Sequence, residues 1–271
     1  MTALPTSTPR STRPYTTLAP VYDFMMQHVN YRKWARYLRR VLKRERCWPA
    51  ESWLDIGCGT GRLLGILEKM GISGDGCDPS GDMLAVARQR LPEAAFHDAG
   101  LPELTGIDRN RYAVATCLYD TMNYLLTGDD IRRAMQRVFA VLRPGGIFIF
   151  DMVSDSHCRQ YFQHYTEQEV VDADRAYHRE SWFDAEEGLQ INRIRIFTPD
   201  GISEEVHRQR IYPLADIHAM IREHTGFELR HCYDDFSMDP ADADSGRVHF
   251  VLVKTAEDIS PASRNGIATA P

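Results

Sequence analysis

The stretch "WLDIGCGTGRLLGIL", Trp53 to Leu67, decides the fold of this chain. An apolar run ends at Asp55 and Ile56, and an amphipathic run begins after three closely spaced glycines, Gly57, Gly59 and Gly61. Glycines let the backbone turn sharply and let a ligand approach it, while the following helix presents its N-terminal N–H groups. The pattern therefore predicts a strand, a ligand-binding turn and a helix.

Strands and helices continue to alternate after this turn. The sequence predicts strands at 53–56, 73–78, 94–97, 112–118 and 147–151, and helices at 61–70, 81–90 and 129–142. Before the turn, apolar residues at helical spacing predict an amphipathic helix over 31–46. Alternating strands and helices form βαβ units. We therefore expect an α/β fold with a Rossmann-like, doubly wound, mostly parallel seven-stranded sheet.

The alternation changes after residue 151. A segment that is helical around 157–165 precedes three β-like runs at 176–184, 189–197 and 202–212, which predict an inserted antiparallel β meander. A helix at 213–225 and strands near 227–233 and 247–254 then complete the sheet. We place one domain at 15–254, with an insert at about 155–212 as an antiparallel cap. The polar ends, 1–14 and 255–271, are expected to be disordered tails.

Composition restricts the class of protein. The 271 residues carry a formal net charge of −6, which gives no reason to expect a nucleic-acid binder. No apolar run approaches the ~20 residues of a membrane span. The six cysteines include no CxxC pair, and the ten histidines include no HExxH motif. We expect a cytoplasmic protein without a membrane segment or a metal.

Two acidic residues indicate which ligand the turn takes. Asp78 ends the next predicted strand, where an acid can accept hydrogen bonds from ribose hydroxyls. Asp55 lies directly before the turn, where it would repel a pyrophosphate but suit a cationic ligand. The spacing is also GxGxG rather than the GxGxxG of dinucleotide sites. A nucleoside without phosphates is favoured, and an NAD-binding Rossmann enzyme remains an alternative.

Five motifs occur in an order that resembles the class I S-adenosylmethionine-dependent methyltransferases: "LDIGCGTG", "GDGCDPSGDML", "FHDAG", "YAVATCLYDTMNYL" and "LRPGGIFIFDM". The resemblance covers about residues 15–254. The early "YTTLAPVYDFMM" is similar to the lid of small-molecule methyltransferases, and the meander resembles that of bacterial N-methyltransferases of amines and amino sugars. The resemblance implies S-adenosyl-L-methionine as methyl donor, S-adenosyl-L-homocysteine as product, and a small-molecule acceptor, most readily an amine nitrogen.

The resemblance also implies roles for individual residues. The backbone at Gly57 and Gly59 would pass the donor's amino-acid part, and Asp78 would bind its ribose. Asp98 and Ala99 would meet the adenine edge, with Met83 and Leu118 on its faces. The full set implied to bind the donor is Tyr22, Asp55, Gly57, Cys58, Gly59, Gly61, Asp78, Pro79, Met83, Asp98, Ala99 and Leu118. Met83 could instead be ordinary core, and Asp98 could cap a turn.

Methyl transfer is an in-line displacement, so the protein mainly aligns the reactants and excludes water. Residues near the carboxyl ends of strands, or in segments that could cover the pocket, are therefore the candidates for acceptor positioning or proton removal. They are Tyr22, Tyr119, Asp151, His157 and His178. The two histidines could instead lie at the surface, and Tyr22 could be a core aromatic beneath the helix.

The basic helix at 31–46 supports a rival interpretation. Its positive side chains could hold RNA phosphates, which would make the chain a tRNA or rRNA methyltransferase. Most such helices are merely solvated on their charged side, so we expect no nucleic-acid partner. A small-molecule O-methyltransferase is a further alternative. For the assembly we expect a monomer or a homodimer.

Overall fold

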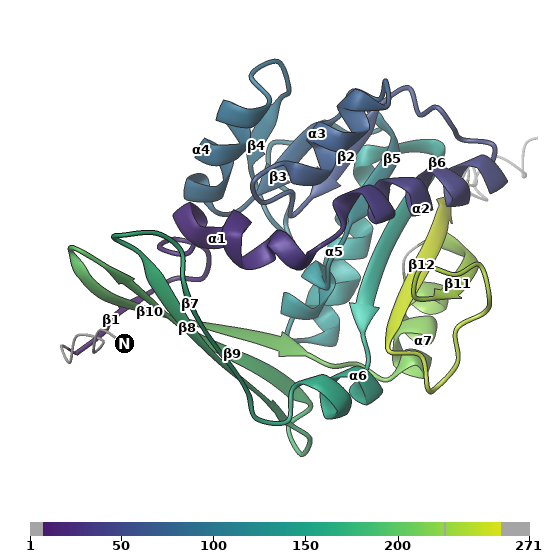
Figure 1. Ribbon diagram of the computed structural model, residues 1–271. Coiled ribbons are helices and arrows are strands. Elements are labelled where there is room, and N and C mark those ends of the chain that lie inside the picture. The colour runs from purple at the N-terminus through teal and green to yellow at the C-terminus, as the bar shows by residue number, and fades with distance from the viewer. Residues whose placement is uncertain (1–7, 225, 256–271) are drawn as a thin grey trace, which may run out of the picture.

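The computed structural model describes residues 8–224 and 226–255, which contain a seven-stranded and a five-stranded sheet (Figure 1). The strands of the larger sheet follow the order β11-β12-β6-β5-β2-β3-β4. Their bounds are β2 (Trp53–Ile56), β3 (Asp75–Asp78), β4 (Phe96–Asp98), β5 (Tyr112–Cys117), β6 (Leu142–Val153), β11 (Phe227–Asp234) and β12 (Arg247–Lys254). In this sheet β12 is antiparallel to both neighbours, and the other pairs are parallel. The predicted Rossmann-like sheet is confirmed.

Helices pack on both faces of this sheet. They are α2 (Tyr31–Arg44), α3 (Arg62–Lys69), α4 (Gly81–Arg90), α5 (Gly128–Val141) and α7 (Leu214–His224). One hydrophobic cluster joins the strands to α5 and α7, and a second joins them to α2, α3 and α4. Burial of these apolar faces is the main favourable contribution to folding. Strand β5, whose six residues are all buried, is nearly continuous in apolar residues because both of its faces are covered.

Helix α2 illustrates how the sequence specifies an element. Asn30 caps it, because the Asn30 side chain accepts a hydrogen bond from the Lys33 backbone N–H over 2.9 Å. Trp34, Leu38 and Val41 are buried, while the basic residues between them face outward. The helix therefore covers the sheet with one face, as the periodicity predicts.

The smaller sheet, called the cap sheet below, has the strand order β1-β10-β9-β8-β7. Its strands are β1 (Arg10–Thr12), β7 (Tyr165–Val170), β8 (Ala176–Asp184), β9 (Leu189–Thr198) and β10 (Gly201–Arg210). The antiparallel β8, β9 and β10 are the predicted meander. Two edge strands were not predicted, because β7 is mostly exposed and polar and β1 is only three residues long.

The short elements connect the two sheets. They are α1 (Ala19–Met25), η1 (Met26–His28), η2 (Thr121–Tyr124) and α6 (Asp155–Tyr161). Figure 1 shows α1 between the cap sheet and the end of the larger sheet where α4 begins. We call residues 13–28 the N-terminal segment. It bridges the two sheets through hydrogen bonds to Glu205 and Thr60.

The structure differs from the sequence analysis at the N-terminus. Arg10–Thr12, expected within a disordered tail, pairs in parallel with Ser203–Glu205 of β10. The backbone groups of a short polar strand gain partners at a sheet edge, which a composition argument does not detect. The expected tails at 1–7 and 256–271 lie outside the described residues. In the described part of the chain, none of the helices combines the length and the apolarity that a membrane crossing requires.

Candidate functional site

A cavity of about 1020 Å³ lies between the carboxyl ends of the central strands and the inner face of the cap sheet. Strands β2 and β5 are neighbours there, although the chain visits β3 and β4 between them. Ligands of open α/β sheets bind at such a switch point in strand order. The glycine turn after β2, the end of β3, the loop after β5, the N-terminal segment, α6 and the cap sheet all line the cavity.

The glycine turn leaves no space for side chains on the cavity floor. Gly57 and Gly59 have φ angles of 71° and 54°, which L side chains rarely adopt. A Cβ on Gly57 would lie 2.8 Å from Thr121 Cγ2, and one on Gly59 would lie 3.3 Å from Met83 Cε. The turn therefore brings its backbone directly to the cavity, as a ligand cradle requires.

Asp78 ends β3 at the wall of this cavity. Its Oδ2 accepts a hydrogen bond from the Gly59 N–H over 3.0 Å, and its Oδ1 accepts one from the Ser80 N–H over 2.9 Å. Burial raises the pKa of Asp78 to about 6, while these two hydrogen bonds act in the opposite direction. A cationic or hydroxyl-rich ligand would favour its charged form.

Asp55 lies beneath the glycine turn. Thr116 Oγ1 donates a hydrogen bond to Asp55 Oδ1 over 2.7 Å, and Trp53 Nε1 donates to Thr116 Oγ1 over 2.9 Å. Burial raises the pKa of Asp55 to about 7, despite the hydrogen bond from Thr116. The carboxyl is therefore held in one orientation and titrates near neutral pH.

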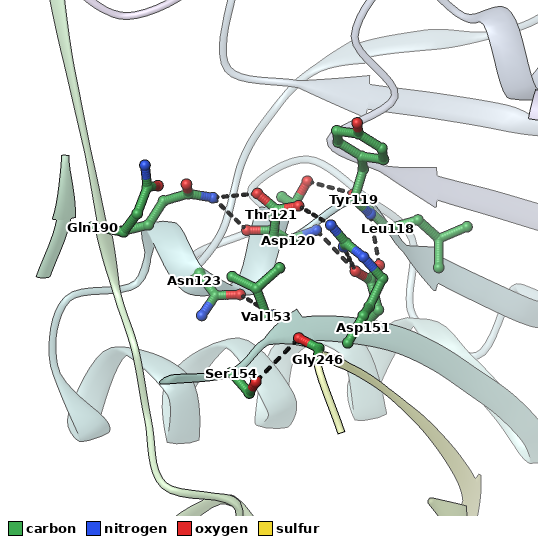
Figure 2. A network of polar contacts seen from close by, with 12 residues as sticks. Leu118, Tyr119, Asp120, Thr121, Asn123, Asp151, Val153, Ser154, Gln190 and Gly246 are labelled. Atoms are coloured by element: carbon green, nitrogen blue, oxygen red, sulfur yellow. Dashed lines mark hydrogen bonds and ion pairs between the residues drawn. The ribbon is translucent and has the colours of Figure 1, made fainter. Parts of the chain in front are cut away.

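Asp151 holds the loop that follows β5 (Figure 2). Its carboxylate accepts hydrogen bonds from the backbone N–H of Tyr119 over 2.6 Å and of Asp120 over 3.1 Å, and it pairs with Arg247. Arg247 also pairs with Asp120 over 2.9 Å, and Gln209 Nε2 donates to Asp120 Oδ2 over 2.6 Å. Tyr119 and Asp120 thereby keep positive φ angles and face the cavity. Asp151 itself is fully buried and does not line it.

The N-terminal segment is fastened to the cap sheet by Glu205 of β10. The carboxylate accepts hydrogen bonds from the backbone N–H of Tyr15, Thr17 and Leu18 over 2.7, 2.7 and 2.9 Å. The Thr17 hydroxyl donates a further one over 2.8 Å. At the other end of the segment, Thr60 Oγ1 donates to Asp23 Oδ1 over 2.7 Å. The segment therefore spans the cavity from the cap sheet to the glycine turn.

Most of the predicted residues line the cavity together. They are Tyr22, Asp55, Gly57, Cys58, Gly59, Asp78, Pro79, Met83, Leu118, Tyr119 and His157. Tyr22 of α1 lies beside the turn, since its Cε1 would be 3.9 Å from a Cβ added to Gly59. His157 of α6 packs between Tyr161 and Phe162, and burial lowers the pKa of its imidazole.

Five predicted residues do not line the cavity. Gly61 is the residue directly before α3, where an added Cβ would lie 3.3 Å from Ala87 Cβ, while Ala99 belongs to the hydrophobic core. Asp98 is exposed at the end of β4, where Gly100 and Leu101 face the cavity instead. Asp151 acts through the network described above. His178 lies on the outer face of β8, because the cavity-lining Arg179 takes the opposite side of the pleat.

The sequence did not predict that the polar residues on the inner face of the cap sheet line the cavity. Arg179 of β8, Gln190 and Asn192 of β9, and His207 and Gln209 of β10 line the cavity, as does Tyr124 after β5. The available signal was polar residues at alternate positions in the first half of β9 and the second half of β10, where an apolar inner face would be usual. Among the described residues, no group of three or more histidine, cysteine or acidic side chains is arranged to hold a metal ion.

Comparisons with known proteins agree with this geometry. The family model described as "Methyltransferase domain" matches residues 54–146. A Bacillus subtilis (strain 168) protein named "Putative methyltransferase YqeM" is 30% identical over 253 residues, which cover 91% of this chain and 99% of that protein. The dTDP-3-amino-3,6-dideoxy-alpha-D-glucopyranose N,N-dimethyltransferase of Streptomyces fradiae is 29% identical over 136 residues, covering 49% of this chain and 52% of the relative.

Solved structures share the fold. An S-adenosylmethionine-dependent methyltransferase from Clostridium acetobutylicum ATCC 824 superposes with a TM-score of 0.74 at 24% identity, covering 89% of this chain and 98% of that one. The full-length relative, the domain match and the glycine turn with its two acids all lead to one assignment. The chain belongs to the class I S-adenosylmethionine-dependent methyltransferases.

Proposed function

We propose that this methyltransferase binds S-adenosylmethionine at the glycine turn and transfers its methyl group to a small-molecule amine held under the cap sheet. The observation that carries the proposal is the continuity of the cavity, which runs from the turn to the inner faces of β8, β9 and β10. Its volume of about 1020 Å³ equals the upper end of the ~300–1,000 Å³ typical of ligand sites. Two small molecules can therefore meet inside it.

The residues at the turn fit the donor. Gly57, Cys58 and Gly59 offer an unobstructed backbone for the amino-acid part, and the Asp78 carboxylate retains lone pairs for ribose hydroxyls. Pro79, Met83 and Leu118 supply apolar surface for the adenine, and Asp55 adds negative charge below the sulfonium end. When bound there, the donor supplies an electrophilic methyl group. Gly61, Asp98 and Ala99 lie outside the cavity lining.

The far end of the cavity fits a polar acceptor. Gln190 is buried, lines the cavity, and its Nε2 has no hydrogen-bond partner among the residues that the structure describes. An unpaired buried amide is costly, so a ligand oxygen there would be stabilising. Arg179 faces the same space and donates to Asn192 Oδ1 over 2.8 Å. These side chains would recognise oxygen substituents on the acceptor.

The middle of the cavity fits an amine. Tyr15, Tyr22, Tyr119 and Tyr124 line it, and burial raises the pKa of each phenol, so all four stay neutral. Aromatic faces and neutral hydroxyl oxygens favour a cationic or hydrogen-bond-donating nitrogen. The aligned relative from Streptomyces fradiae is named as an N,N-dimethyltransferase, which supports the same acceptor atom.

Donor consumption measured against separate pools of amines, phenols, carboxylates and tRNA tests the proposal. We expect turnover with the amine pool. Turnover with phenols alone would identify the protein as an O-methyltransferase instead of an N-methyltransferase. Turnover with tRNA would overturn the small-molecule assignment. The triple charge reversal Arg36→Glu, Arg39→Glu and Lys43→Glu on the exposed face of α2 is the companion variant. It should leave amine turnover and its salt dependence unchanged, whereas an RNA enzyme would lose activity.

A further inference from the structure

Four side chains form a chain of hydrogen bonds beside the cavity. His207 Nε2 lies 3.2 Å from Glu205 Oε2, His207 Nδ1 lies 3.0 Å from the Tyr124 hydroxyl, and the hydroxyls of Tyr124 and Tyr15 are 2.6 Å apart. Glu205 and His207 are two residues apart on β10, so both face inward. His207, Tyr124 and Tyr15 line the cavity, and Glu205 is fully buried behind them.

When the imidazole is neutral, the carboxylate sets the direction of every bond in this chain. A carboxylate only accepts hydrogen bonds, so His207 carries its proton on Nε2. The Nδ1 of a neutral imidazole then accepts from the Tyr124 hydroxyl. Since Tyr124 donates its one proton there, its oxygen accepts from the Tyr15 hydroxyl. The Tyr15 oxygen is left with free lone pairs at the cavity.

We propose that these residues form a proton relay that converts the acceptor from an ammonium into the neutral amine that can attack the methyl group. The proposal rests on the proposed amine function. Tyr15 is the catalytic residue, because its oxygen is the end of the relay with free lone pairs and would touch the reacting nitrogen. Tyr124, His207 and Glu205 act through it.

The step balances in protons and charge. The ammonium gives one proton to the Tyr15 oxygen, Tyr15 passes its own proton to Tyr124, and Tyr124 passes its own to His207 Nδ1. The nitrogen now has a free electron pair, and an imidazolium faces the Glu205 carboxylate. The C–N bond then forms as the S–C bond breaks, which leaves a methylammonium product and a neutral thioether. The imidazolium releases its proton after the product leaves.

The electrostatics suit a relay rather than a phenolate base. Burial raises the pKa of Tyr15 and of Tyr124, so each phenol passes a proton on instead of staying ionised. Burial alone would raise the pKa of Glu205, but hydrogen bonds from His207, Thr17 and Leu18 hold it below its usual value. The other titratable groups that influence the pKa values of these two phenols electrostatically are Asp120, Asp78, Tyr22 and Arg179.

The relay also depends on closure of the cavity. The Glu205 oxygens that orient His207 accept the backbone N–H groups of Tyr15, Thr17 and Leu18. Docking of the N-terminal segment therefore brings Tyr15 to the cavity and completes the chain in one event. Proton transfer would then occur only when water is excluded.

The tautomer of His207 tests the relay without any acceptor. In full-length protein carrying ¹⁵N-labelled histidine, with the His207 signals assigned from His207→Gln, we expect a neutral Nε2–H imidazole at pH 7.5. Tyr124→Phe should shift the Nδ1 signal, which loses its donor, and should leave the proton on Nε2. An Nδ1–H tautomer or an imidazolium at this pH would overturn the relay, whatever the donor-consumption screen shows.

Kinetics test the catalytic role with the amine that turns over fastest in the screen. Tyr124→Phe and His207→Gln should lower kcat about 100-fold near neutral pH, with KM and donor affinity retained. The deficit should shrink as the pH approaches the pKa of the free amine, because solvent then removes the proton. Arg208→Gln, on the exposed outer face of β10, is the matched control and should keep full activity. A loss that is equal at every pH, or no loss, would refute the relay.

Discussion

Ser80 Oγ donates a hydrogen bond to the backbone carbonyl of Tyr15 over 2.7 Å. The same oxygen accepts the Met83 N–H over 3.2 Å and so caps α4. Ser80 also follows Asp78 and Pro79 directly, and its own N–H binds the Asp78 carboxylate. One serine therefore connects the nucleoside end of the cavity with the segment that covers it.

Ser80→Ala should weaken donor binding as well as stability. The lost cap costs about 1 kcal/mol of the free energy of unfolding, and the freed Tyr15 carbonyl loosens the covering segment. Thr127→Ala is the matched control, because it removes the N-cap of α5 at a residue that does not line the cavity. Thermal melts should show similar losses for both variants, whereas calorimetric titration with donor should respond only to Ser80→Ala. Equal donor affinity in the two variants would show that Ser80 does not influence donor binding through the covering segment.

Asp78→Asn should weaken donor affinity about 10- to 100-fold, since a charged acceptor of ribose hydroxyls is replaced by a neutral amide. Asp98→Asn should change it less than about 2-fold, because Asp98 is exposed at the adjacent strand end and lies off the cavity. Titration calorimetry on both variants decides the assignment. A larger loss of donor affinity in Asp98→Asn than in Asp78→Asn would show that Asp98 makes the ribose or adenine contact.

Gly59→Ala should abolish detectable donor binding while costing only moderate stability. Its φ of 54° strains any side chain by about 1 kcal/mol, and its methyl group would enter the cavity beside Met83. Gly71→Ala has the same kind of strain, at a φ of 81°, with nothing within 4 Å of the added methyl. Both variants should melt at lower temperature, and only Gly59→Ala should lose the donor. Retained binding in Gly59→Ala would show that the donor passes elsewhere.

The pKa of about 7 at Asp55 predicts how stability depends on pH. The folded protein holds this proton up to about pH 7, whereas the unfolded chain releases it near the ordinary value of about 4. The folded state therefore binds more protons between these values, and the ligand-free protein should lose stability as pH rises from 4 to 7. Asp55→Asn keeps an oxygen for Thr116 and should flatten that slope in urea titrations. An unchanged dependence of stability on pH in Asp55→Asn would show that other groups cause it.

Tyr22→Ala should reduce donor affinity or turnover, because its ring covers the glycine turn from α1. Tyr22→Phe should retain most of both, since the aromatic face makes the contact. Phe24→Ala removes a half-buried ring from the same helix without reaching the cavity, so it serves as the control for stability. If Tyr22→Ala melts far below Phe24→Ala and the folded fraction keeps full activity, Tyr22 belongs to the core.

The larger sheet could be predicted because its signals are local and repeated. The central strand β5 and the second half of β6 are mostly apolar runs, and helices begin or end at recognisable residues such as Ser80 and Gly226. The glycine turn and Asp78 were found for the same reason. Strand β7 was missed because an exposed edge strand needs no apolar alternation.

Contacts between distant segments could not be predicted. A shift of one residue along β8 exchanges the two faces, so the sequence could not distinguish the outward His178 from the inward Arg179. Asp151 was correctly placed at a strand end, but its partner Arg247 is 96 residues away, and nothing local indicates that the pair holds a loop. Glu205 and His207 also acquire their neighbours only when the cap sheet meets the N-terminal segment.

The hydrogen bonds between Glu205 and the N-terminal segment affect the order in which the protein folds during synthesis. Tyr15 and Glu205 are 190 residues apart, so a ribosome exposes the N-terminal segment long before its partner exists. The glycine turn and its neighbouring strands are synthesised in the interval and can acquire their order first, because their contacts are closer in sequence. The cavity therefore forms open, and residues 13–28 can dock on Glu205 only after β10 has been synthesised.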